Sequence, residues 1–433
     1  MLKKIMLPRI GDEKGFALVT VLTLSFLLFG LAMSYMDILL SERRLVQASF
    51  NSLSTQGLAE AGIEQAMWEY NYDSALFTGW STSGTTKSKV VTGFANTGGT
   101  TLGNYTVSVN TSTKTISSTS TYTNAYGTGL SATLKATVAS NPMFSGAILS
   151  NGTIALKKAA TVDSYNSSTG QYGGANIASN GDVVTNSADT TAAVTFTTPS
   201  TINGDVATGT GGVVVGSSMV TGTVSSGVTK TLPNNDTIYA SQIAACQATT
   251  ALGSRGSGTI AASGYYNYTD INLGSSSTLT VNPGSGTVYL YLSNTSTSST
   301  AINMAKTSSI RVSSGSLVML VAGQVDIDKD CTISYTTNSI THTSTPQGLN
   351  TSNITIAGLS TCTSVSVDKN FLLCGTLSIP SAPFSSEDKD LTIYGALIAS
   401  SVDIKKECTI HYDDNLVNGP SDGYKLQWYR RVS

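Results

Sequence analysis

The pattern of apolar and polar positions first predicts one long N-terminal helix. An uncharged, strongly apolar run extends from Phe16 to Met36, and in a helix these 21 residues span roughly the ~30 Å hydrocarbon core of a bilayer. The next stretch, 37–70, contains no proline and interleaves apolar with charged residues, as an amphipathic helix does. We therefore predict a continuous helix over 16–70, with a transmembrane half at 16–36 and an amphipathic half at 37–70.

Beyond the helix the period of the pattern changes to two, which is the period of a β-strand. Tyr105, Val107 and Val109 alternate with polar residues, and a second alternating run follows near residue 134. The region 71–140 is therefore predicted to form a small sheet after the helix.

The remainder of the chain, 141–433, repeats itself loosely. Asn-Gly turns between short apolar runs recur at Asn151, Asn180 and Asn203, with spacings of 29 and 23 residues. Short strands separated by turns at such intervals are typical of stacked repeats.

Two longer matches connect distant parts of this region. Val325–Tyr335 matches Val402–Tyr412 at an offset of 77 residues, and Gly146–Ser150 matches Gly395–Ala399. Recurring strand-turn-strand phrases are typical of a parallel β-helix, whereas an immunoglobulin-like sandwich predicts no such recurrence. We expect a right-handed parallel β-helix, or solenoid, with the aromatic strand around Trp428 covering one open end. The fold class is thus mainly β with one long N-terminal α-helix.

Composition narrows the classes of function. The 433-residue chain has a formal net charge of -2 and only 12% charged residues, so it lacks the basic surface typical of nucleic-acid binding. Its hydrophobic fraction of 40% is high for a disordered chain, and we interpret the Ser/Thr-rich part as folded β structure. Two histidines and scattered acids supply no ordered catalytic set, so we predict neither an enzyme nor a cofactor.

The candidate metal and disulfide residues lie in the second half. Asp326, Asp328 and Asp330 alternate as in the start of a calcium loop, but the glycine and distal glutamate of that motif are missing, which favours a solvated strand face. The five cysteines form no C-x-x-C pair, and we predict no metal site. Cys362 and Cys374 are the candidate disulfide.

The segment before the apolar run is short and basic. Residues 1–15 contain four cations and two acids and end in Gly15, directly before Phe16. Cations on this side keep it in the cytoplasm, so the rest of the chain should face outward. An ordinary secretory signal has a shorter apolar core and a cleavage region after it, whereas a plain signal anchor fits this pattern as well.

The N-terminal region resembles the type IV pilin and pseudopilin family, and in particular PilX-type minor pilins. The resemblance rests on the leader 1–15, the Gly15-Phe16 junction, the apolar run and the stretch Leu58–Ala66, in that order, and covers about the first 70 residues. It implies that a prepilin peptidase cuts between Gly15 and Phe16 and methylates the new amino terminus. It also implies that other pilins are partners through the N-terminal helix.

One position departs from the family pattern. Major pilins carry glutamate at the fifth mature position, where it pairs with the amino terminus of a neighbouring subunit, and Thr20 occupies that position here. An unpaired amine in the apolar core of a filament is costly. The resemblance therefore implies a tip-located subunit, as in pseudopilins that also lack this glutamate.

From these observations we expect a minor structural subunit of a type IV pilus or related filament, acting in assembly initiation and surface adhesion. One helix would hold it in the inner (cytoplasmic) membrane with its C-terminal domain outside, and assembly would carry it into an extracellular filament. The alternative is a membrane-anchored β-helix that binds or processes glycans. A row of carboxylates or aromatics along one groove would favour this alternative.

Overall fold

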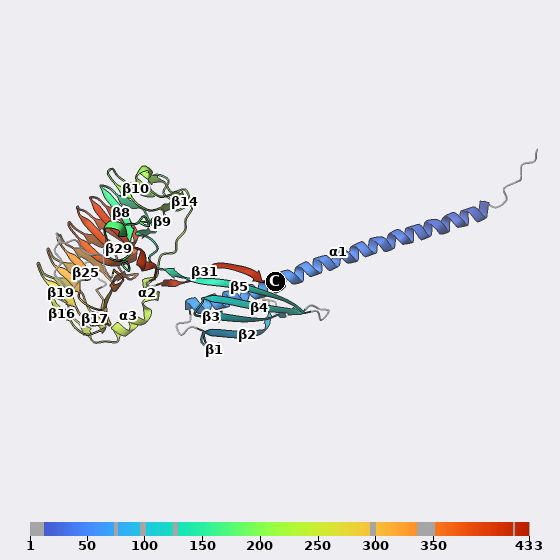
Figure 1. The fold of residues 1–433 in the computed structure, drawn as a ribbon, viewed down its shortest axis with the longest axis horizontal. Coiled ribbons are helices and arrows are strands. Elements are labelled where there is room, and N and C mark those ends of the chain that lie inside the picture. The colour runs from blue at the N-terminus through green and yellow to red at the C-terminus, as the bar shows by residue number, and fades with distance from the viewer. Residues whose placement is uncertain are drawn as a thin grey trace, which may run out of the picture. The chain divides into compact units, whose positions relative to one another are not determined.

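The protein is described from a computed structural model, and the described residues are 13–72, 77–95, 101–123, 129–294, 300–335, 351–418 and 421–432. Most of the leader predicted over 1–15 lies outside them. The chain divides into two compact units (Figure 1). The first comprises Met1–Ala139 with Tyr424–Ser433, and the second comprises Ser140–Gly423.

The first unit begins with one long helix, α1 (Glu13–Tyr72), which confirms the predicted N-terminal helix. Every residue from Leu18 to Phe50 is exposed, and beyond Phe50 one stripe of α1 is buried against a sheet. Gly62 lies in this buried stretch. A Cβ at Gly62 would come within 2.2 Å of Ser118 Oγ, so glycine allows the helix to approach the sheet closely.

The sheet of the first unit has six strands in the order β1-β2-β3-β4-β5-β31. They are β1 (Ser81–Ser83), β2 (Thr86–Ala95), β3 (Thr101–Asn110), β4 (Thr115–Thr123), β5 (Gly129–Pro142) and β31 (Ser421–Val432). The first five pair antiparallel with their neighbours in sequence. Tyr105, Val107 and Val109 share the buried face, as their alternation indicates, and pack with Ala59 and Ile63 of α1.

The second unit is built around a 25-stranded sheet. Its strands are β6 (Ile148–Ser150), β7 (Ile154–Leu156), β8 (Ala160–Tyr165), β9 (Val183–Thr185), β10 (Val194–Phe196), β11 (Thr201–Ile202), β12 (Val206–Thr208), β13 (Val214–Val215), β14 (Val224–Ser226), β15 (Ala251–Leu252), β16 (Gly258–Ile260), β17 (Gly264–Tyr268), β18 (Ile271–Leu273), β19 (Thr278–Val281), β20 (Thr287–Leu292), β21 (Thr300–Met304), β22 (Ser309–Val312), β23 (Ser316–Val321), β24 (Gln324–Ile327), β25 (Thr332–Tyr335), β26 (Ile354–Gly358), β27 (Val365–Val367), β28 (Leu372–Ser386), β29 (Leu391–Ile404) and β30 (Cys408–Asp413). Short helices lie between them: η1 (Gly174–Asn176), η2 (Ser217–Met219), α2 (Asn235–Ile238), α3 (Ala240–Gln247), η3 (Thr351–Asn353) and η4 (Asp414–Asn418).

From β17 to β25, each strand pairs in parallel with the strand three places further along the chain. Along one such series Leu290 of β20 lies opposite Met319 of β23, which lies opposite Ile356 of β26. These three side chains are at most 2% exposed and belong to one continuous core. This long parallel sheet is consistent with the predicted β-helix.

The order of pairing in this sheet is not the order of the chain. The first strands, β6 to β8, pair on one side with β9 to β11 and on the other side with β29 and β30. The first series of strands, β6 to β14, therefore extends the sheet away from β6 in one direction. The chain then crosses over through α2 and α3. A second series, β15 to β30, ends beside β6 to β8 on their other side. The last repeat stacks on the first, so the matching segments Gly146–Ser150 and Gly395–Ala399 lie side by side.

The second unit is inserted between two neighbouring strands of the first. The chain enters it from β5 and leaves it into β31, and these two strands are hydrogen-bonded neighbours in the six-stranded sheet. The expectation that the strand around Trp428 covers an open end of the β-helix is therefore wrong, and the predicted 141–433 domain ends at Gly423. Tyr424 instead packs on Tyr70 of α1, with 4.7 Å between ring centroids.

Glycines allow the repeats of the first series to stack closely. A Cβ on Gly204 would lie 2.5 Å from the carbonyl carbon of Gly181, so the second and third Asn-Gly turns are direct neighbours. The first turn differs from the sequence interpretation, because Gly152 stacks against Ser400 of the last repeat. The turns at Asn151 and Asn180, 29 residues apart, therefore lie at two different corners of the repeat. The turns at Asn180 and Asn203, 23 residues apart, lie at equivalent corners.

Candidate functional site

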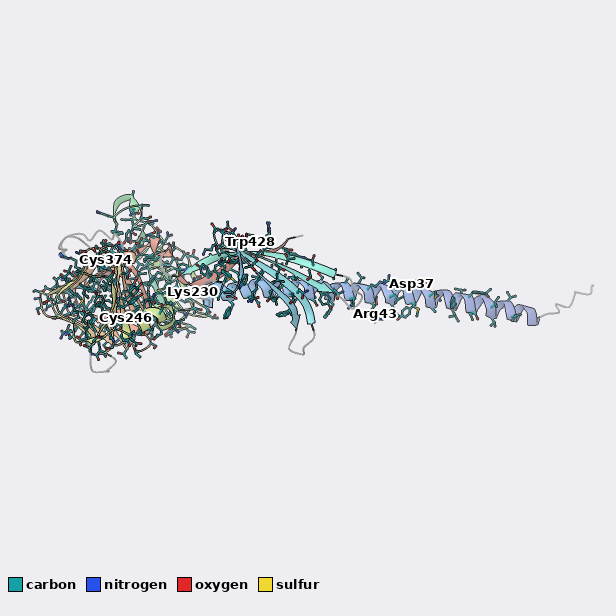
Figure 2. All side chains as sticks on the ribbon, turned by 90° about the horizontal axis from the view of Figure 1, so that it is seen from below. Asp37, Arg43, Lys230, Cys246, Cys374 and Trp428 are labelled. Carbon is teal, nitrogen blue, oxygen red and sulfur yellow. The ribbon has the colours of Figure 1, made fainter. Side chains whose placement is uncertain are left out.

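The first candidate site is the exposed apolar half of α1. The described helix Leu18–Asn71 is long and apolar enough to cross a membrane, with a mean hydropathy of 2.0 in its apolar window and none of that window buried. Phe26 and Phe29 are 70% and 65% exposed, and Figure 2 shows side chains extending freely around this part of the helix. Such exposure to water costs about 25 cal/mol per Å² of apolar surface. The surface therefore suits lipid or other apolar helices.

Three side-chain hydroxyls within this half donate hydrogen bonds to carbonyls of the helix itself. The Thr23 hydroxyl donates to Val19 O at 2.9 Å, the Ser25 hydroxyl donates to Val21 O at 2.7 Å, and Ser34 makes the same type of contact one turn back. In a bilayer core no water is available to these hydroxyls. The local hydrogen bonds make the segment compatible with an apolar environment.

The residues of the predicted processing site lie in the first turns of α1. Gly15 and Phe16 follow its first residue, Glu13, and Thr20 is exposed one turn later, where its carbonyl accepts a hydrogen bond from the Thr23 hydroxyl at 3.0 Å. Cleavage between Gly15 and Phe16 and the role of Thr20 stay predictions.

The three aspartates weighed as a calcium loop do not form a metal site in the described part of the chain. Asp326 is exposed in β24, Asp328 Oδ1 accepts the backbone N–H of Lys329 at 2.7 Å, and Asp330 Oδ1 accepts from the Asn370 amide at 2.7 Å. Among the described residues no group of three or more His, Cys, Asp or Glu is placed to hold a metal ion. Asp328 and Asp330 act instead in the turn that follows β24, and Asp326 lies in the strand itself.

Asp328 and Asp330 belong to the first of a row of charged corners that the sequence analysis missed. Asp328, Asp368 and Asp388 each accept the backbone N–H of the lysine that follows, at 2.7 to 2.9 Å. The next residue has a left-handed backbone at each corner, with φ between 56° and 67°. The recurring Asp-Lys-Asp or Asp-Lys-Asn tripeptide is the signal that could have revealed the row.

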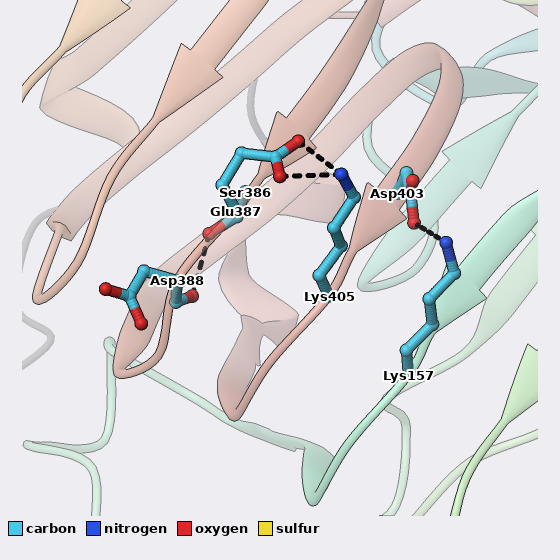
Figure 3. Close-up of polar contacts among 6 residues, drawn as sticks. All are labelled: Lys157, Ser386, Glu387, Asp388, Asp403 and Lys405. Atoms are coloured by element: carbon cyan, nitrogen blue, oxygen red, sulfur yellow. Dashed lines mark hydrogen bonds and ion pairs between the residues drawn. The ribbon is translucent and has the colours of Figure 1, made fainter.

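The same row continues into ion pairs across the last and first repeats (Figure 3). Lys405 contacts Glu387 at 2.6 Å, and Lys157 of the first repeat contacts Asp403 of the last at 2.7 Å. All four side chains are more than 40% exposed, so solvent screens both pairs and neither is a main source of stability. Beside the Lys405 and Glu387 pair lies a groove of about 530 Å³, lined by Asn303, Ala305, Asp326, Ile327, Asp328, Ser366, Val367, Asp368 and Glu387.

The candidate disulfide is not formed. No disulfide links any of the five cysteines, all of which are buried. Cys362 packs in the main core of the parallel sheet, whereas Cys374 packs in a separate cluster with Tyr165 and Tyr394. A spacing of twelve residues brought the two cysteines near in sequence, but their side chains enter different clusters.

We expect all five thiols to react with an alkylating reagent after denaturation without reductant, and to react slowly in the folded protein. Burial raises the pKa of Cys362 to about 11 and that of Cys408 to about 12, so few thiolates form near neutral pH. Mass spectrometry after alkylation counts the modified cysteines. Three modified cysteines in the denatured protein would instead indicate one disulfide.

A buried polar cluster lies where the first and last repeats meet. His411 Nδ1 of β30 is 2.5 Å from Asp163 Oδ1 of β8, and the Tyr172 hydroxyl donates to Asp163 Oδ2 at 2.7 Å. The Tyr172 ring lies over His411 with 3.6 Å between ring centroids. His411 and Asp163 are only 4% and 3% exposed. The cluster is closed to substrate and joins the two repeats.

The sequence analysis did not identify this partner of His411. Asp163 and His411 are 248 residues apart in sequence and become neighbours only because β8 and β30 pair. His342 lies outside the described residues.

Comparison with known proteins gives one family match. Residues 221–418 match the model of a domain of unknown function (DUF7305). The match covers the crossover and the second series of strands, and leaves out α1, the six-stranded sheet and most of the first series. No curated protein and no solved structure matches the chain.

Proposed function

We propose that this chain is a minor, tip-located structural subunit of a type IV pilus or related filament, with no enzymatic role. The observation that carries the proposal is α1 itself. One half of this helix exposes apolar residues on every side, and the other half packs on a sheet of the same chain. A helix of this kind can lie in a membrane first and among the helices of other subunits later.

The proposal assigns each part of the chain a place. The leader 1–15 is removed by a prepilin peptidase, the mature helix from Phe16 joins other pilins, and the six-stranded sheet corresponds to the small sheet of pilins. The parallel sheet winds as a right-handed β-helix that is displayed outside the cytoplasmic membrane and contacts a surface. Thr20 supplies no carboxylate for a neighbouring amino terminus, which supports a position at the tip.

A second function is favoured by one specific feature, the groove beside Glu387. Asp326, Asp328, Asp368 and Glu387 line it together with Asn303. Such a row of carboxylate and amide groups along a β-helix would suit hydroxyl-rich ligands, so a membrane-anchored glycan-binding protein is the alternative.

Processing tests the first proposal. We expect co-expression with a prepilin peptidase to shorten the chain so that it starts at methylated Phe16, as measured by intact mass and N-terminal analysis. Gly15→Val should block the cut, because the resemblance places that glycine at the scissile bond. Gly11→Val changes a glycine of the same leader and should leave the cut intact. A chain that keeps Met1 in the presence of an active peptidase, or that starts far beyond Phe16, would refute the filament proposal.

A further inference from the structure

A groove of about 540 Å³ lies in the first unit, between α1 and the beginning of β5. Six of its described lining residues belong to α1 and one to β5: Leu40, Arg43, Arg44, Gln47, Ala48, Asn51 and Leu130. The two carboxylates nearest in sequence, Asp37 and Glu42, are not among these described lining residues. The groove therefore combines two cations with a small apolar surface.

The groove continues the stripe by which α1 contacts the sheet. Leu40, Arg44, Gln47 and Asn51 follow one another at helical spacing, and Thr55, one turn further, is buried against the sheet. Arginine and glutamine at positions of this stripe are unsuited to an apolar contact. They indicate a polar ligand in place of a core.

Asn51 is the second observation that indicates a ligand. The side chain is 3% exposed, and its Oδ1 has no hydrogen-bond partner among the residues that the structure describes. A buried acceptor without a donor is unfavourable, so the native environment should supply a donor. Arg43 and Arg44 are exposed and present guanidinium groups that bind phosphate with paired hydrogen bonds. A ligand that satisfies all three groups carries a phosphate and a hydroxyl donor.

The position of the groove along α1 matches the surface of a bilayer. Arg43 and Arg44 lie seven and eight residues beyond Met36, the last residue of the uncharged run, which is about 10–12 Å along the helix. Helical side chains point toward the N-terminus, so both guanidinium groups reach back toward the apolar run. Figure 2 shows Arg43 beside the helix between the sheet and the apolar run. Their charges thus fall close to the headgroup layer.

We propose that this groove binds the headgroup of an anionic glycerophospholipid in the leaflet that faces away from the cytoplasm. The phosphodiester contacts Arg43 and Arg44, and a headgroup hydroxyl donates to Asn51 Oδ1. The acyl chains follow the exposed apolar surface of α1 toward its N-terminus. The proposal rests on the proposed function only for the outward orientation of the chain. Binding of this lipid holds the isolated subunit at a fixed depth in the membrane before assembly.

Native mass spectrometry of the full chain in detergent tests the proposal, with phosphatidylglycerol as the titrated lipid and phosphatidylcholine as the reference. We expect the wild type to retain phosphatidylglycerol preferentially. Arg43→Gln with Arg44→Gln should weaken retention about 30-fold, which corresponds to about 1 kcal/mol for each arginine near an anionic lipid. Arg430→Gln with Arg431→Gln removes the same charge from β31 of the same unit and should leave retention unchanged.

Asn51→Leu tests the acceptor separately. This variant should weaken retention of phosphatidylglycerol but not of phosphatidic acid methyl ester, which has the phosphodiester without headgroup hydroxyls. Equal retention by wild type and the Arg43/Arg44 double variant would overturn the proposal. Displacement of the lipid by millimolar inorganic phosphate would overturn it in favour of a free-anion site.

Lipid retention and processing by the peptidase fail independently. A chain that is cut before Phe16 but shows no preference for phosphatidylglycerol would overturn the lipid site alone. A chain that retains this lipid but is never cut would refute the filament proposal alone.

Discussion

Replacing His411 by alanine is expected to lower the free energy of unfolding by about 3–5 kcal/mol, because it leaves the Asp163 carboxylate buried without its nitrogen partner. Among the described residues, the Asp163 carboxylate then keeps the Tyr172 hydroxyl as its one side-chain partner, and the Tyr172 ring loses the imidazole over which it lies. The contact joins the first and last repeats of the parallel sheet. Urea unfolding followed by circular dichroism measures the change.

Asp403→Ala is the matched control for His411→Ala. Asp403 also joins the last repeat to the first, through Lys157, but both side chains are more than 40% exposed. This control is expected to cost about 0–1 kcal/mol. Combining Asp163→Ala with His411→Ala should cost less than the sum of the single changes, by about 0.5–3 kcal/mol. If His411→Ala costs no more than Asp403→Ala, the buried pair does not hold the two repeats together.

Gly395→Ala should be the second large effect, with a loss of about 3 kcal/mol or more in the free energy of unfolding. Gly395 of β29 has φ of 134°, a backbone conformation that residues with a Cβ rarely adopt. A Cβ there would also lie 2.0 Å from the carbonyl oxygen of Gly375 in β28. Because that neighbour is backbone, the stacked repeats must move apart to make room. Thermal and urea unfolding measure the loss.

Gly253→Ala is the corresponding control. Gly253 is exposed, and a Cβ on it would meet no described atom within 4 Å. Its replacement should change the free energy of unfolding by less than about 0.5 kcal/mol. A similarly small change for Gly395→Ala would show that the strand pair β28 and β29 can rearrange locally.

The sequence was most informative where a pattern is local. The run Phe16–Met36 is enough to predict a long helix, because absence of charge over that length leaves few alternatives. The repeated phrases predict parallel stacking, and Gly146–Ser150 and Gly395–Ala399 are indeed paired. The matching segments Val325–Tyr335 and Val402–Tyr412 are not direct neighbours in the sheet. Register leads from Asp326 through Ser366 and Ser385 to Asp403, which is three steps of pairing.

Features that depend on distant partners could not be predicted in this way. The Asp163 and His411 contact requires that the last repeat return to the first, and no local pattern specifies that return. The partner of the strand around Trp428 was also missed, because alternating aromatic residues indicate a strand but not the sheet it joins. The charged corners were visible as a tripeptide, yet their alignment appears only once the register is known.

The insertion between β5 and β31 has a mechanical consequence. The parallel sheet is tied to the first unit by two covalent connections, one entering after β5 and one returning to β31, and these two strands are hydrogen-bonded to each other. Under the proposed function, in which the parallel sheet contacts a surface, tension on that sheet would be shared between both connections. After a single proteolytic cut in one connection, the other connection would still join the parallel sheet to the first unit. A domain held by one linker would be released by the same cut.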